Sequence, residues 1–108
     1  MDDQEFQLQA DRALTGLTRK LAATGDQYGF DADLDDGALK IEFDEPPGRF
    51  VISPNSAVRQ IWISALVKSF KLDWDPARPA FVLTSTGQSL DELTAELIST
   101  QLGETIRI

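Results

Sequence analysis

The 108-residue chain contains no cysteine and no histidine. Their absence excludes disulfide bonds, thiolate nucleophiles, imidazole general bases, zinc sites built on either residue and cysteine-ligated iron–sulfur clusters. Any metal that this chain binds must therefore be held by oxygen ligands, which suit hard cations and select loosely among them. There is also no Gly-rich phosphate loop and no Ser or Thr spaced with Lys as a nucleophile pair, so we expect a protein that is not an enzyme.

Basic residues are also scarce. The chain has 10 Lys and Arg against 18 Asp and Glu, and the net charge of −8 disfavours nucleic acid and anionic membranes as partners. It lacks a long apolar run and the basic-then-apolar N-terminus of a signal peptide, so we expect a soluble protein. The hydrophobic content of 42% is ordinary for a globular protein, and the length predicts one domain over residues 1–108.

Two segments have the periodicity of amphipathic helices. Apolar residues recur at three- and four-residue spacing over residues 3–23, and Gly25 is the expected stop. A second helix is predicted to begin at Ser89, which forms a capping box with Glu92, and to end at Gly103. The last residues of the chain are expected to pack back on the core.

Short strands with turn signals between them fill the region between the two helices. They are predicted at residues 30–35, 38–44, 49–53, 59–65, 68–74 and 80–84. Asp36-Gly37 is a tight hairpin signal, and Pro54 is expected to end the third strand. The order of helix, about six antiparallel strands and helix predicts an α+β fold, a two-layer sandwich with both helices on one face of the sheet and the other face open.

Trp62 lies on the open face of this predicted sheet. The run from Gln60 to Ala65 alternates between polar and apolar residues, and Ile61 and Ile63 must face the core. The indole therefore lies on the polar side of the strand. An exposed tryptophan is typical of a contact surface, whereas the alternative is that a loop or the tail of the chain covers it.

Three aspartates line the outer face of the first strand, at Asp31, Asp33 and Asp35. Like charges at this spacing destabilise a sheet unless a cation or a basic group offsets them. The pattern favours either a weak site for a cation or a basic protein, or an edge strand whose charge blocks aggregation.

The segment from Asn55 to Ser64 resembles the strand signature of the frataxin family: an Asn, then Gln before an apolar residue, Trp, a second apolar residue and Ser. Leu72-Asp73-Trp74 is similar to the aromatic-Asp-Trp that ends the following strand in that family. The segment from Gly87 to Leu93 is similar to its Gly-x-Ser-Leu-x-x-Leu helix start. The resemblance covers essentially the whole chain, and the ends resemble those of the short bacterial, CyaY-type members. It implies the same α–sheet–α fold.

The resemblance implies an iron-binding regulator or adaptor of iron–sulfur cluster assembly, docked on a complex of cysteine desulfurase and scaffold protein. Iron, as Fe2+ or Fe3+, would be bound weakly by surface carboxylates. The implied metal residues are Asp3, Asp11, Asp26, Asp31 and Asp33, and the implied partner-binding residues are Asn55, Gln60 and Trp62. Two alternatives stay open: a ferroxidase and iron-storage activity, and a protein-interaction module that works without metal.

We further expect a monomer, with metal-induced oligomerisation as the alternative. The expected location is the bacterial cytoplasm, or the mitochondrial matrix if the chain is a processed eukaryotic form.

One stretch departs from the family pattern. Family members usually carry clustered acidic residues on the last turns of the first helix and in the loop after it. Here Thr18 to Gly25 contains the cations Arg19 and Lys20 and no carboxylate. A thinned acidic ridge should bind iron more weakly and less selectively. We therefore predict weak iron binding, with docking through Trp62 retained.

Overall fold

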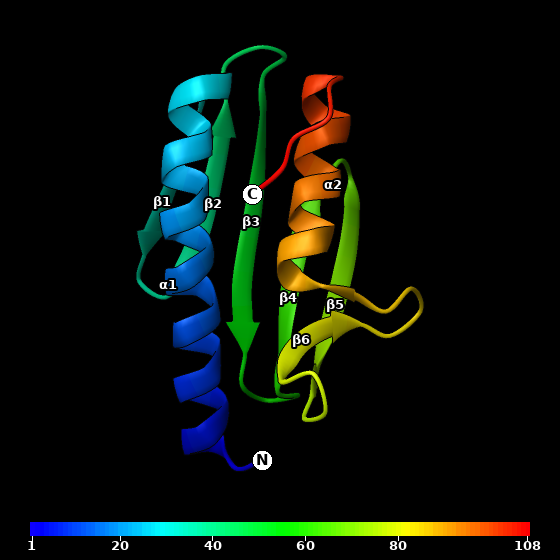
Figure 1. Cartoon of the computed structure of the whole chain (residues 1–108). Helices are drawn as coiled ribbons and strands as arrows, with labels where there is room; N and C mark the ends of the chain where they lie inside the picture. Colours follow the sequence, from blue (N-terminus) through cyan, green and yellow to red (C-terminus); the bar gives the residue numbers. More distant parts are fainter.

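The chain folds into two helices and one antiparallel sheet, in a computed structural model that describes residues 1–108. The elements are α1 (Asp3–Tyr28), β1 (Phe30–Asp35), β2 (Ala38–Phe43), β3 (Gly48–Asn55), β4 (Gln60–Ala65), β5 (Lys68–Asp75), β6 (Ala80–Leu83), β7 (Gln88–Ser89) and α2 (Leu90–Leu102). The sheet order is β1-β2-β3-β4-β5-β6-β7, so each strand pairs with its sequence neighbours. Both helices lie on one face, α1 on the β1–β2 side (Figure 1). The predicted two-layer α+β sandwich is confirmed.

The first helix is longer than predicted. The predicted stop at Gly25 is wrong, because α1 continues to Tyr28 and Gly29 ends it in the left-handed conformation, at φ 79°. The Gly29 N–H donates to the Gly25 carbonyl oxygen over 2.8 Å. Gly25 is buried, and a Cβ placed there would lie 2.3 Å from the carbonyl oxygen of Phe30. This glycine allows α1 to approach β1 closely, which periodicity alone does not reveal.

The hairpin predicted at Asp36-Gly37 is confirmed, with φ 52° and 79° at its two residues. The third strand does not end at Pro54, however, because β3 continues to Asn55 and Pro54 pairs with Ile61. The β2–β3 ladder ends at Ile52, so Pro54 has a partner strand on one side only, where a missing N–H is tolerated. The two-residue strand β7 is an addition to the predicted set.

The core lies between the sheet and the two helices, and the inward residues of the predicted strands fill it. Phe6 of α1 meets Phe81 of β6 edge to face, with ring centroids 5.9 Å apart. The C-terminal tail runs between the helices (Figure 1), and Ile106 is only 3% exposed, as the sequence predicts. The Ile106 N–H donates to the Ser99 hydroxyl oxygen over 2.9 Å. Neither helix has the length and hydropathy needed to cross a membrane.

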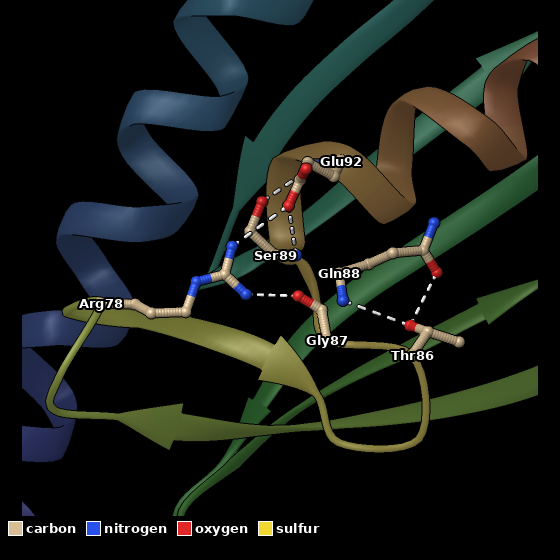
Figure 2. A network of polar contacts seen from close by, with 6 residues as sticks. All are labelled: Arg78, Thr86, Gly87, Gln88, Ser89 and Glu92. Atoms are coloured by element: carbon tan, nitrogen blue, oxygen red, sulfur yellow. Dashed lines mark hydrogen bonds and ion pairs between the residues drawn. The ribbon is translucent and has the colours of Figure 1, made fainter.

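A polar network fixes the start of α2 (Figure 2). The predicted capping box is confirmed: the Ser89 N–H donates to Glu92 Oε1 over 2.9 Å, and the Glu92 N–H donates to Ser89 Oγ over 3.2 Å. Arg78, from the loop before β6, pairs with Glu92 at 3.3 Å and donates to the Gly87 carbonyl oxygen. Hydrogen bonds from Ser89, followed by that from Arg78, lower the pKa of Glu92.

Candidate functional site: the open sheet face

The structure brings the three predicted partner-binding residues together. Asn55 pairs with Gln60 across β3 and β4, and Gln60 precedes Trp62 by two residues on the same strand, so all three side chains lie on the sheet face opposite the helices. Trp62 is 37% exposed. We use the name Trp62 face for the outward residues Val51, Ser53, Asn55, Gln60, Trp62, Ser64, Ser69, Lys71 and Asp73.

A chain of hydrogen bonds from β4 through β5 to the residue after β6 orients the indole. Trp62 Nε1 donates to Gln60 Oε1 over 2.9 Å, and Gln60 Nε2 donates to Asp73 Oδ1 over 3.0 Å. The hydroxyl of Thr84 then donates to Asp73 Oδ2 over 3.2 Å. Lys71 Nζ lies 5.0 Å from the centroid of the Trp62 ring, within the range of a cation–π contact. These contacts hold the aromatic group in one orientation.

A shallow hollow beside Trp62 has a volume of about 190 Å³. Its lining combines an indole, hydroxyl groups and an ammonium group, from Val51, Ser53, Trp62, Ser64, Ser69 and Lys71 among others. This volume is below the several hundred Å³ usual for small-molecule sites. A hollow of this size has room for a single amino-acid side chain.

Asn55 has a structural role on this face as well as its predicted one. Its side-chain oxygen accepts a hydrogen bond from the Ala57 N–H over 3.2 Å and shapes the turn between β3 and β4. The half-buried Asn55 therefore positions the start of β4, where Gln60 links Trp62 to Asp73 in the hydrogen-bond chain. Its direct contact with a partner stays a prediction.

The predicted metal residues on α1 lie far apart. Asp3 and Asp26 are near opposite ends of the helix, roughly 35 Å apart at a rise of 1.5 Å per residue, and Asp11 lies between them. Asp3 pairs with Arg59 at 3.1 Å, which ties the start of α1 to the end of the β3–β4 turn. These three aspartates therefore do not share one ion.

The two remaining metal residues lie on the edge strand β1. Asp31 is opposite Glu42, and Asp33 is opposite Lys40. No group of three or more acidic side chains in the structure is placed to hold one metal ion. Carboxylate oxygens suit iron chemically, but their arrangement gives no converging ligand set, and their role in metal binding stays a prediction.

Sequence reasoning did not assign Lys71, Asp73 and Thr84 to the site. The alternation over residues 68–74 places Lys71 and Asp73 on the outer side, which is a usable signal. Their position beside Trp62 and Gln60 depends on the register between β4 and β5. The connecting residues Leu66-Val67 carry no turn signal, so the sequence does not specify that register.

The fold and its open face define the frataxin-like class of α+β sandwiches. The fold is similar to that of a solved frataxin from Psychromonas ingrahamii, described as a model for stability modulation within the CyaY protein family. The two structures align with a TM-score of 0.77 over 99% of this chain and 97% of that one, at 23% sequence identity. The frataxin-like domain family matches residues 1–104, and the chain belongs to that family.

Several curated relatives are similar over much of their length. "Iron-sulfur cluster assembly protein CyaY" of Thioalkalivibrio sulfidiphilus is 31% identical over 108 residues, which is 100% of each chain. The protein of the same name from Azotobacter vinelandii is 33% identical over 76 residues, 68% of each chain. Mitochondrial frataxin of Arabidopsis thaliana is 28% identical over 112 residues, 100% of this chain and 59% of that one. The resemblance read from the motifs is thereby confirmed.

Proposed function

We propose that this chain takes part in iron–sulfur cluster assembly as a cytoplasmic, non-enzymatic adaptor, and that it docks on a complex of cysteine desulfurase and scaffold protein through the Trp62 face. The observation that carries the proposal is the state of Trp62 itself, which is 37% exposed and yet hydrogen-bonded to Gln60. Membership of the frataxin-like family, and the similarity to bacterial proteins named iron–sulfur cluster assembly protein CyaY, support a role in this assembly.

The chemistry of the Trp62 face favours a protein partner over a small ligand. Tryptophan is enriched among interface residues that dominate binding energy, and such residues lie in fixed, well-packed surroundings. Gln60 accepts a hydrogen bond from the indole and Lys71 lies over its ring, and we propose that one side chain of the partner enters the hollow beside it. Docking of this kind needs no covalent step and no general acid or base.

Iron has a minor part in the proposal. We propose that Fe2+ contacts the chain weakly, through separate surface carboxylates such as Asp26 and Asp31, and that docking does not depend on it. An iron-oxidising and iron-storing activity is the less favoured function, because it needs several carboxylates converging on the metal and no group of three has that arrangement.

The deciding experiment measures the dissociation constant of the wild-type chain and of Trp62→Ala with a purified bacterial desulfurase–scaffold complex. We expect Trp62→Ala to weaken binding by on the order of 30-fold, the effect of about 2 kcal/mol. Leu8→Ala is the control, because Leu8 is an exposed apolar residue on the helix layer. Equal affinity of Trp62→Ala and wild type would falsify the proposal.

Two further arms address the metal. Binding measured in the presence of a strong chelator should be unchanged if docking is independent of iron. A titration with Fe2+, followed by backbone amide shifts, should give gradual and dispersed changes. Saturable broadening confined to the C-terminal end of α1 would contradict weak, scattered iron contacts, and loss of docking with chelator would make the metal an obligatory part of the interface.

A further inference from the structure

The hairpin that joins β4 to β5 has an unusual tip. Its two loop residues, Leu66 and Val67, both have positive φ, at 54° and 57°. A two-residue loop of this kind favours Asn-Gly or Asp-Gly, because those residues adopt positive φ at little energetic cost. The β1–β2 hairpin of the same sheet has a loop of equal length and uses Asp36-Gly37. One sheet therefore contains both the favoured and the disfavoured version of the same turn.

Packing explains one of the two residues but not the other. Leu66 is half-buried against the core, so it has a structural reason to be apolar. Val67 has a relative exposure of 108%, and a β-branched residue at positive φ is a rare conformational outlier. Neither conformation nor packing accounts for valine at this position. Strained and exposed residues of this kind occur disproportionately at functional sites.

The tip lies within reach of the Trp62 face. Ser64 and Ser69 are the last outward pair before the loop, and Val67 is five residues after Trp62, so their Cα atoms are at most roughly 16 Å apart. A typical protein interface covers about 800 Å² on each partner and spans that distance. One partner can therefore contact Trp62 and Val67 together.

Two lysines lie on β5 next to the tip, although the chain carries −8. Lys68 directly follows Val67, and Lys71 lies over the Trp62 ring. Half of the ten basic side chains are in ion pairs with carboxylates, at Lys20, Lys40, Arg49, Arg59 and Arg78. Lys68 and Lys71 are not among them. A partner surface that approaches the tip is favoured if it carries carboxylates.

We propose that Val67 is a second anchor for the same partner as Trp62, and that it enters an apolar hollow whose rim carries carboxylates facing Lys68. This inference rests on the proposed function and deepens it by specifying the chemistry of the partner surface. A convex, fully exposed apolar tip fits a concave apolar site, and the preformed turn limits the entropy lost on binding.

The test compares Val67→Asn and Val67→Gly with wild type on the purified desulfurase–scaffold complex. Both replacements suit the positive φ, so we expect the melting temperature to stay equal or rise while the dissociation constant rises about tenfold. An anchor loses affinity with no loss of stability, whereas a merely structural residue would lose or gain stability and affinity together. Leu8→Gln is the apolar control on the helix layer.

The test of the charge compares the association rates of Lys68→Glu and Arg19→Glu. Arg19 is the control, because it lies on α1 and, like Lys68, is in no ion pair. We expect Lys68→Glu to slow association and Arg19→Glu to have little effect. Wild-type affinity in both Val67 variants, with loss in Trp62→Ala, overturns the anchor and leaves the proposed function intact. Equal association rates for the two charge variants overturn the carboxylate rim. A wild-type chain that does not bind the complex overturns both proposals.

Discussion

The same substitution at two glycines of α1 should have opposite effects on stability. Gly16 lies in the middle of the helix, and a Cβ added there meets nothing within 4 Å. Gly25 lies one turn before the end, and its Cβ would lie 2.3 Å from the Phe30 carbonyl oxygen and 3.3 Å from the Phe30 ring. The first position has room for a methyl group, and the second requires the backbone of β1 to move.

The magnitudes follow from these surroundings. Gly16→Ala should raise the free energy of unfolding by about 0.5–1 kcal/mol, because alanine restricts the unfolded chain and favours the helix. Gly25→Ala gains the same helical preference but forces an overpacked contact that costs about 1–3 kcal/mol. Because the contact is with backbone, which relaxes less readily than a flexible side chain, we expect a net loss of about 1–2 kcal/mol.

Urea denaturation of the two variants, followed by tryptophan fluorescence, measures the difference directly. With a slope of roughly 2 kcal/mol per molar urea, the two midpoints should be separated by about 1 M, on opposite sides of the wild-type midpoint. If Gly25→Ala is stabilised as much as Gly16→Ala, the close contact between α1 and Phe30 is absent in solution, and the reasoning about Gly25 is refuted.

Three further predictions concern the sheet face, the tail and the start of α2. Trp62→Ala should lose about 1–2 kcal/mol of stability, since roughly two-thirds of the residue is covered by neighbours, and Trp74 remains to report unfolding; an unchanged urea midpoint would contradict this. Ile106→Ala should lose about 2–4 kcal/mol by leaving a cavity between the helices, whereas exposed Arg107→Ala should stay within about 0.5 kcal/mol, and calorimetry that gives equal losses would disprove the packed tail. Glu92→Gln should lower the melting temperature at neutral pH, and this effect should shrink as the pH falls through the depressed pKa of Glu92. A carboxylate whose pKa is lowered in the folded state stabilises the protein at pH values above the usual glutamate pKa near 4.5, and the stabilisation disappears when the group is protonated. A difference in melting temperature that does not change with pH would contradict the role of the charge.

Regular alternation and strong turn signals made much of the fold predictable. The strand from Phe30 to Asp35 and its Asp36-Gly37 turn are specified locally, and so is the capping box at Ser89. The error at Gly25 has a different origin. A glycine near the end of a helical pattern has two physical uses, chain reversal and close packing, and only the position of Phe30 decides between them.

The candidate site was predictable only where it depends on the sequence of a single strand. The alternation around Trp62 identifies the outward face from one strand alone. Asp73 and Thr84 join the site through hydrogen bonds between strands, so their roles depend on register, and the β4–β5 register has no local turn signal. The dispersal of Asp3 and Asp26 was visible in principle, because their spacing on one helix fixes their separation.

The sequential order of the strands also has a kinetic consequence. Each strand pairs only with the strands next to it in the chain, so successive hairpins close short loops and lose little chain entropy as they form. Contacts between the two ends of the chain, such as Phe6 with Phe81 and Lys20 with Asp91, close much longer loops. We therefore expect the sheet to form by local steps and the contacts of α1 with β6 and α2 to form last, so that weakening the Phe6–Phe81 contact mainly accelerates unfolding and leaves the refolding rate nearly unchanged.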